Sequence, residues 1–404
     1  MKKTMFTRVF IYLAAFSIFL SACNSGNKND KDEHKMSHAD SVKKALADSI
    51  EKVIKSADRL VNDASRFIAG MDLDTASKLY SLTKTDDWKQ YKTTFDSAWK
   101  ILDTGRMSPQ RKWTAEELKI PNTNGLDLWY PFSGPDFLNA YLHFPNAKNY
   151  YFVALEPPGE LPQLEKMKDK EMKSYLSHVF KALNDLMNKS YFITSYMGGD
   201  LQKGKANGTV PIICLFMARM DCQVLKVETI DIDNDGKVII PKTAAESVHK
   251  NPIKGVRIDF VPSDKREIRS LYYWSVNVHD TEIKTGPEFT KYVASLGKVN
   301  TYIKAASYLM HADDFKVMRD MTLSQSEVLL QDDTGIAYRF FNASEWKITL
   351  FGKYAKPVKN FPWINEPDLA KAFKDSTVKP LPFHIGYHWQ TLEDNQILAM
   401  KIKK

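Results

Sequence analysis

The sequence lacks the short motifs that would identify a common enzyme class directly. It contains no G-x-S-x-G, no H-E-x-x-H and no paired C-x-x-C pattern, so neither a serine-hydrolase elbow nor a familiar zinc signature is present. It has no internal repeat. The apolar run near its start, Val9 to Leu20, is broken only by Ser17 and is too short for a membrane span, which needs about 20 residues.

The chain also lacks a basic run that could follow a nucleic-acid backbone. The formal net charge is +8, but lysine and arginine are interleaved with aspartate and glutamate along the chain. A nucleic-acid-binding protein usually gathers its positive charge on one stripe or face. We therefore expect no nucleic-acid partner.

Residues 1–22 have the three parts of a secretory signal: a basic flank, a short apolar run and small residues before the cleavage point. The tetrapeptide Leu20-Ser21-Ala22-Cys23 closely resembles the lipobox of bacterial lipoproteins. This resemblance implies that the thiol of Cys23 carries a diacylglyceryl group after cleavage. The chain is thus expected to be exported and to reach the membrane through the lipid on Cys23.

Residues 23–40 are predicted to be a flexible tether, because residues 24–35 contain no apolar side chain that could be buried. Their charged stretch is similar to signals that direct some lipoproteins to the outer membrane, so we expect an anchor in the cell envelope at the outer membrane. The alternative for the stretch itself is a solvated linker without a targeting role. Cleavage removes three positive charges and no negative charge, which lowers the net charge from +8 to +5.

Residues 41–107 are predicted to form a helical N-terminal region, because apolar residues recur there with a period close to 3.6. Residues 108–404 are predicted to form a mixed α+β domain. Helices are expected at 137–144, 164–187, 313–321 and 366–375. Strands are expected at 126–132, 150–155, 210–220, 223–231, 237–240, 256–261, 271–278, 337–341, 346–354 and 383–389. The first two strands flank a helix and should pair in parallel, whereas later ones read as hairpins. The predicted class is therefore α+β, with a mixed, mainly antiparallel sheet and packed helices.

Two cysteines remain besides the lipid-bearing one, Cys214 and Cys222. An oxidising compartment permits a disulfide between them, but an extended segment between the two would hold the sulfurs beyond bonding distance. A bridge therefore requires a turn near Met220, and the alternative is two buried free thiols.

Two patterns resemble metal sites, and both have a structural explanation. Asp231 to Gly236 has the alternating acids of a calcium loop, but Lys242 stands where the closing acid is required, so a hairpin turn is favoured. His384 and His388 have the spacing of a helical zinc pair, but their neighbours favour a strand, in which the two side chains would lie about 13 Å apart. We expect no metal and no cofactor.

The segment from Leu128 to Glu156 has the outline of a strand-helix-strand unit that binds a ligand at its strand ends. Ser133 and Asp136 precede the helix, and Glu156 ends the second strand. A single glycine in the loop argues against a nucleotide site. The alternative is that Ser133 or Asp136 simply caps the helix.

A second polar group is formed by the adjacent acids Asp332 and Asp333, with Arg339 a few residues later and His311 before the preceding helix. Neighbouring acids point in different directions, so a purely structural turn is the alternative. If the fold brings this group to the same rim as Asp136 and Glu156, burial beside other acids should raise the pKa of one carboxyl.

Several segments together resemble an uncharacterised family of secreted bacterial proteins, over most of residues 126–355. They include YPFSGPD at residues 130–136, FMAR at 216–219, KAASYLMH at 304–311 and LQDDTGI at 330–336. The resemblance implies one folded unit and carries no catalytic role.

Two functions from different classes fit these observations. The first is a non-catalytic envelope protein that binds a small molecule, a glycan or a partner. The second is an extracytoplasmic hydrolase with a carboxylate-rich cleft. A deep cleft with converging carboxylates would favour the hydrolase, and a shallow aromatic face would favour the binding protein. The absence of a nucleophile signature favours binding.

Overall fold

The computed structural model describes residues 38–189, 208–241, 253–264, 267–375 and 377–403. The expected signal peptide, Cys23 and most of the expected tether lie outside these residues. The chain divides into two compact units, Met1–Ala45 and Leu46–Lys404. In the described part of the chain, no helix combines the length and the apolar composition that a membrane span needs.

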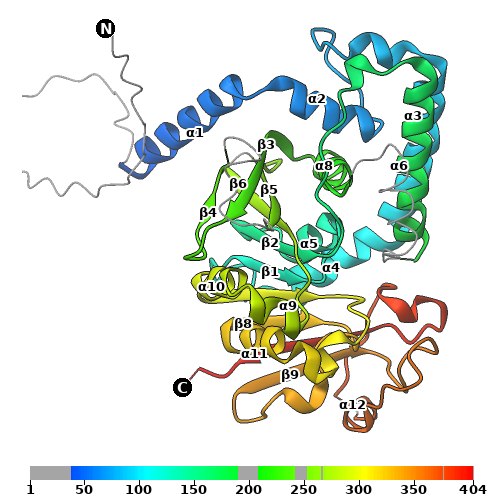
Figure 1. The fold of residues 1–404 in the computed structure, drawn as a ribbon. Helices are drawn as coiled ribbons and strands as arrows, with labels where there is room; N and C mark the ends of the chain where they lie inside the picture. Colours follow the sequence, from blue (N-terminus) through cyan, green and yellow to red (C-terminus); the bar gives the residue numbers. More distant parts are fainter. Residues whose placement is uncertain (1–37, 190–207, 242–252, 265–266, 376, 404) are drawn as a thin grey trace, which may run out of the picture. The chain divides into compact units, whose positions relative to one another are not determined.

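A ten-stranded mixed sheet organises the unit Leu46–Lys404 (Figure 1). Its strand order is β4-β3-β5-β6-β2-β1-β7-β8-β10-β9. The strands are β1 (Leu128–Pro131), β2 (Asn149–Ala154), β3 (Gln223–Ile232), β4 (Val238–Ile239), β5 (Lys254–Val261), β6 (Arg269–Ser275), β7 (Val299–Ile303), β8 (Ser326–Gln331), β9 (Trp346–Gly352) and β10 (Asn395–Lys401). Parallel pairs fill the middle of the sheet, from β6 to β8, and antiparallel pairs form both ends. The α+β class with a mixed sheet is thus confirmed.

Helices from two parts of the chain pack on the two faces of the sheet. The helices of the described residues are α1 (His38–Ser56), α2 (Arg59–Ile68), α3 (Asp86–Leu102), α4 (Ser108–Glu117), α5 (Phe137–His143), α6 (Asp169–Lys189), α8 (Val210–Arg219), α9 (Asp280–Thr285), α10 (Glu288–Ser295), α11 (Lys316–Gln325) and α12 (Pro367–Ala372). One hydrophobic cluster packs helices α2, α3, α4, α5, α6 and α8 against one face of the strands. A second cluster packs α9, α10 and α11 against the other face. Along β1, Trp129 belongs to the second cluster and Tyr130 to the first, as the alternation of a strand requires.

The described part of the N-terminal region, residues 38–107, is mainly helical, and α2 and α3 share a core with the sheet. Phe67, Trp88 and Phe95 belong to the same buried cluster as the strand residues Tyr130 and Phe152. The indole of Trp88 donates to the carbonyl of Phe67, which ties α3 to the end of α2. Burial of these large aromatic side chains stabilises the region by about 2 kcal/mol for each side chain.

The centre of the sheet contains a topological switch point between β1 and β7. The β1-α5-β2 crossover leads to one side of β1, and the β7-α11-β8 crossover leads to the other side of β7. Because parallel crossovers are right-handed, these two units place their helices on opposite faces. Accordingly, Phe137 of α5 lies in one core cluster and Met318 of α11 in the other.

Most expected elements of the amino-terminal half of the domain are confirmed, and one is wrong. The strand expected at 210–220 is helix α8, which is buried along Val210–Ala218. A helix that is apolar on all sides has no 3.6-residue pattern and can be mistaken for a buried strand. Cys214 therefore lies on a helix and Cys222 beyond its end, and both thiols are free and buried. Burial raises the pKa of both to about 12.

The hairpin turn expected at Asp231 to Gly236 is present between β3 and β4. Asp233 accepts backbone hydrogen bonds from Asp235 and Lys237 through its side chain, and Gly236 N–H donates to the carbonyl of Asp233. The carboxylate of Asp231 accepts from the backbone N–H groups of Ile232 and Ile253. The acids of this motif thus have the roles of turn-forming residues.

Two strands expected near the C-terminus are wrong. Residues 337–341 contain a 3-10 helix, Tyr338–Phe340, and residues 383–389 lead into another, Tyr387–Gln390. His384 and His388 consequently have different partners: His384 contacts Asp394, and His388 contacts Asp333.

Candidate functional site

A cavity of about 1040 Å³ opens at the carboxyl ends of β1, β2 and β7. Its walls come from the loops that follow these strands and from two C-terminal segments, residues 356–365 and 387–393. This is the place of the topological switch point, where neighbouring crossovers diverge and leave room for a ligand. The cavity is therefore the candidate functional site.

A buried ion pair joins two of the strand ends inside this cavity. Asp136, at the start of α5, contacts Lys304, which directly follows β7, and the Lys304 Nζ to Asp136 Oδ2 distance is 2.6 Å. Both side chains are almost fully buried. Tyr130 donates its hydroxyl to the same carboxylate at 3.0 Å, and the backbone N–H of Asn139 donates to the other oxygen at 3.1 Å. Asp136 thus caps α5, as expected, and also holds Lys304.

Burial lowers the pKa of Lys304, although the charge of Asp136 and its hydrogen bond act in the opposite direction. A lysine in this environment is a poorly hydrated cation at a fixed position. Such a group can bind an anionic or polar part of a ligand.

Ser133 and Glu156 also line the cavity. Ser133 is buried, its N–H donates to the carbonyl of Val153 at 2.9 Å, and its hydroxyl is 3.4 Å from the same oxygen. Glu156 follows β2 and is 6% exposed. The three residues expected from the strand-helix-strand pattern, Ser133, Asp136 and Glu156, therefore do lie together.

The backbone around the cavity contains an unusual concentration of left-handed residues. Among the described non-glycine residues with positive φ, five lie in the cavity loops: Phe132, Ala305, Ser307, Tyr308 and Leu392. Asp221 is the other one. Such conformations cost about 1–3 kcal/mol each and cluster at functional sites, where surrounding contacts enforce them.

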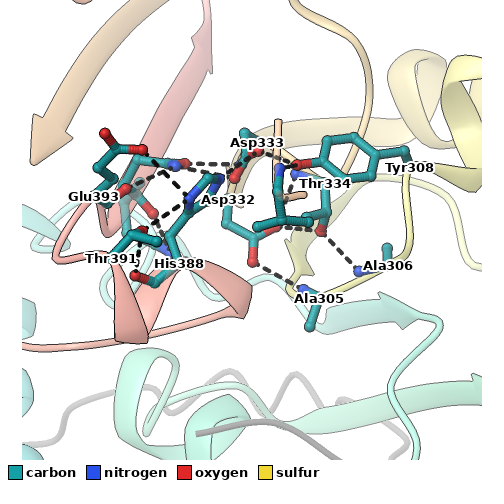
Figure 2. Close-up of polar contacts among 12 residues, drawn as sticks. Ala305, Ala306, Tyr308, Asp332, Asp333, Thr334, His388, Thr391 and Glu393 are labelled. Carbon is teal, nitrogen blue, oxygen red and sulfur yellow. Dashed lines mark hydrogen bonds and ion pairs between the residues drawn. The ribbon is translucent and has the colours of Figure 1, made fainter. Parts of the chain in front are cut away.

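Behind the cavity, the turn after β8 holds the second polar group (Figure 2). The carboxylate of Asp333 accepts hydrogen bonds from the hydroxyl of Tyr308, from the side-chain amide of Asn395 at 2.9 Å and from His388 Nε2 at 3.2 Å. Asp333 and the His388 side chain are almost fully buried, but His388 lines the cavity. His388 thus connects the buried acids to the ligand space.

Burial alone would lower the pKa of His388, but the hydrogen bond and charge of Asp333 outweigh burial and raise it. Because Nε2 faces Asp333, the other ring nitrogen, Nδ1, faces Thr391 Oγ1 at 3.4 Å and Glu393 Oε2 at 3.9 Å. Thr391 and Glu393 both line the cavity. The imidazole is thus oriented by a carboxylate on one side and can exchange a proton on the other.

Asp332 occupies the next position and faces the loop after β7. One carboxylate oxygen accepts from the backbone N–H of Ala305 at 2.9 Å, and the other accepts from the N–H of Thr334 at 3.1 Å. Burial, reinforced by the neighbouring charge of Asp333, raises the pKa of Asp332 to about 6. A raised pKa is the direction expected for a carboxyl that is buried beside another acid.

Gly386 packs its backbone against the Asp332 carboxylate. Its φ is +70°, and a Cβ at this position would lie 2.5 Å from Asp332 Oδ2. We predict that Gly386→Ala destabilises the protein by about 2–4 kcal/mol, because backbone strain and the displaced carboxylate both contribute. Thermal or urea unfolding would measure this effect.

Gly125→Ala is the matched control for that prediction. Gly125 has a similar φ of +72°, but a Cβ at this position would have no neighbouring atom within 4 Å. Its replacement should therefore report backbone strain alone. Equal losses of stability in the two variants would show that contact with Asp332 is unimportant.

His311 and Arg339 form a separate cluster with Glu366. Arg339 Nη1 lies 3.2 Å from Glu366 Oε1, and its Nη2 donates to the carbonyl of His311 at 3.0 Å. Burial raises the pKa of Glu366 to about 7, and burial together with Arg339 lowers that of His311 to about 4. Neither His311 nor Arg339 is among the described residues that line the cavity.

Neither Asp332 nor Asp333 is among the described residues that line the cavity, so the two polar groups do not share its wall. The loop after β7 connects them. Lys304, paired with Asp136, is followed directly by Ala305, whose N–H donates to Asp332. Sequence patterns did not single out Lys304 or His388 as site residues. The available signals were a lysine inside an otherwise apolar and small-residue stretch, and a histidine between two aromatic residues, Tyr387 and Trp389.

An aromatic wall borders the cavity on its C-terminal side. The rings of Phe361 and Tyr387 stack with centroids 5.9 Å apart, and Trp363 contacts Phe361 edge-on at 5.6 Å. Trp363 is 71% exposed, and the cavity residue Leu155 is 63% exposed. Phe361, Tyr387 and Leu155 line the cavity, and Trp363 lies next to Phe361 outside this lining. Exposed apolar side chains in and beside a cavity are typical of binding surfaces.

Comparisons of the chain with protein-family models, with curated proteins and with solved structures found no match.

Proposed function

We propose that this chain is a lipid-anchored envelope protein whose cavity binds a small polar molecule or the end of a glycan. The observation that carries the proposal is the cavity at the switch point, with the Asp136–Lys304 pair inside it and aromatic side chains at its mouth. A large cavity with a few fixed polar groups among apolar ones is the usual form of a small-molecule site.

The proposal is tested by calorimetry on the full chain in detergent, with a panel of sugars, amino sugars and amino acids as probes. At least one probe should bind saturably. Thr391→Trp, which places an indole at the cavity mouth, should weaken this binding at least tenfold. Thr104→Trp, at an exposed position outside the cavity lining, should have no effect. Failure of every probe at millimolar concentration, or unchanged binding by Thr391→Trp, would contradict the proposal.

The membrane part of the proposal rests on the lipobox sequence at Leu20–Cys23. We predict that Cys23→Ser abolishes incorporation of a fatty-acid label and leaves an uncleaved precursor, because the acylated thiol is the substrate of the processing step. Labelling in the native host and fractionation of its membranes measure both effects. Normal acylation of the variant would contradict the prediction, and Cys222→Ser serves as the control for loss of a thiol.

A second candidate function is an extracytoplasmic hydrolase, and a specific observation favours it. The cavity is lined by the carboxylate residues Asp136, Glu156 and Glu393, and His388 is oriented by Asp333 as a proton donor or acceptor. If this function holds, fluorogenic esters or glycosides should be turned over, and His388→Asn should abolish turnover while probe binding persists. Binding without any turnover supports the first function.

A further inference from the structure

Glu156 is held rigidly at the end of β2. The hydroxyl of Tyr273 donates to its backbone carbonyl at 2.9 Å, and the next carbonyl, that of Pro157, accepts from Thr209 N–H at 3.2 Å. The residue is buried and lines the cavity. These contacts hold the backbone just beyond β2 in place beside the cavity.

The carboxylate of Glu156 has no hydrogen bond or ion pair with any residue that the structure describes. The buried cation of the cavity, Lys304, is bound to Asp136 at 2.6 Å. Lys356 and Lys359 lie on exposed positions of the opposite loop. The carboxylate oxygens of Glu156 are not among the described side-chain atoms that are closed off from solvent without a partner. They therefore face the open space of the cavity, where a cationic group of a ligand can reach them.

We infer that the cavity binds a ligand carrying a primary ammonium group, with the Glu156 carboxylate as its counter-ion. This inference rests on the proposed ligand-binding function and names the class of its ligand. The ammonium would supply the donors and the charge that Glu156 lacks among the described residues of the chain. A charge-assisted hydrogen bond of this kind is stronger than a neutral one.

The aromatic wall formed by Phe361, Trp363 and Tyr387 is consistent with a cationic ligand. Aromatic faces attract ammonium groups, and several rings around one cavity are a known way to bind organic cations. A metal cation fits less well, since calcium takes six to eight oxygen ligands. In the described part of the chain, no group of three or more histidine, cysteine, aspartate or glutamate side chains is placed to hold a metal.

The test uses pairs of probes that differ only in the charge of the amine. Glucosamine is compared with N-acetylglucosamine, and 6-aminohexanoate with 6-acetamidohexanoate, by calorimetry on the full chain in detergent. The first pair represents an amino sugar and the second an aliphatic amine. The native chain should bind the amine of at least one pair at least tenfold more tightly than its acetylated partner.

Glu156→Gln should remove this preference and leave the affinity for the acetylated probe within twofold. Its melting temperature should stay close to that of the native chain, because the carboxylate has no hydrogen bond or ion pair with a described residue to lose. Glu160→Gln, an exposed position four residues later, is the matched control and should keep the preference. A variant that melts lower than the native chain would assign Glu156 a structural role and overturn the inference.

The failure of this inference differs from the failure of the proposed function. Acetylated or neutral probes that bind in the cavity at least as tightly as the amines would refute the ammonium ligand and leave a binding cavity. An amine preference that survives Glu156→Gln would refute the role of Glu156. If no probe of any charge binds, the proposed function fails, and the inference fails with it.

Discussion

Replacing Lys304 by methionine is expected to lower the free energy of unfolding by about 3–5 kcal/mol. The substitution keeps most of the side-chain volume but leaves Asp136, which is 1% exposed, without its cation. Breaking a buried pair by removing one partner is costly because the remaining charge is desolvated and uncompensated. Urea unfolding followed by far-UV circular dichroism would measure the loss.

A double-mutant cycle with Asp136→Asn separates the ion pair from the packing of each side chain. In the native background, Asp136→Asn leaves the charge of Lys304 unpaired. In the Lys304→Met background it instead removes the unpaired charge of Asp136, so it should cost less there. Lys316→Met is the control for an exposed pair: Lys316 and Asp320 are 59% and 52% exposed, so its effect should stay below about 0.5 kcal/mol. A loss of less than about 1 kcal/mol in Lys304→Met would show that the pair is unimportant for stability.

The central strand-helix-strand unit could be predicted from sequence because its local signals agree with its tertiary surroundings. Leu128–Pro131 and Asn149–Ala154 are short apolar runs, and between them Pro135 and Asp136 mark a helix start. Asp136 satisfies the helix N-terminus as its residue type suggests. The parallel pairing then follows, since a helix between two strands requires a crossover.

Strands β7 and β8 were not foreseen as strands because they are buried on both faces. Val299–Ile303 is buried at every position, and Ser326–Gln331 at all but one. Strands of this kind lose the alternation of apolar and polar residues on which recognition depends. The same loss of periodicity made helix α8 look like a strand.

The candidate site shows the same limit at the level of single residues. Asp136, Glu156, Asp332 and Asp333 stand out in sequence as acids at strand ends and turns. The role of Lys304 depends on the end of β7, which the pattern did not reveal. The role of His388 depends on Asp333, 55 residues away in the chain, and no local pattern contains such a pairing.

The acid-base behaviour of Asp332 gives the second large expected effect. Its pKa is raised by burial and by the charge of Asp333, from 3.8 to about 6 in the folded protein. A carboxyl whose pKa is raised in the folded protein binds its proton more tightly there than in the unfolded chain. Its contribution to the stability of the folded protein is therefore complete below pH 3.8. This contribution disappears as the pH rises through about 6. A pKa difference of about 2, at about 1.4 kcal/mol for each pKa unit, corresponds to about 3 kcal/mol.

Other groups act in the opposite direction, so the native chain alone would not reveal this contribution. Burial lowers the pKa of His143 to about 3 and that of His311 to about 4. The stability that these histidines contribute is present above pH 6.5 and is lost as the pH falls through their folded pKa values. The effect of Asp332 must therefore be measured as a difference from a variant that keeps both histidines.

Asp332→Asn provides that difference, because it removes the titrating group and retains an oxygen that can accept from Thr334. The loss of the Ala305 hydrogen bond adds a cost that does not depend on pH. The native chain should therefore gain about 2.4 kcal/mol of the full effect relative to Asp332→Asn when the pH is lowered from about 8 to about 4. Urea unfolding of both proteins at about pH 8, 6 and 4 would measure the gain, with the exposed Asp235→Asn as control. A constant difference across this range would mean that Asp332 does not change its protonation state there.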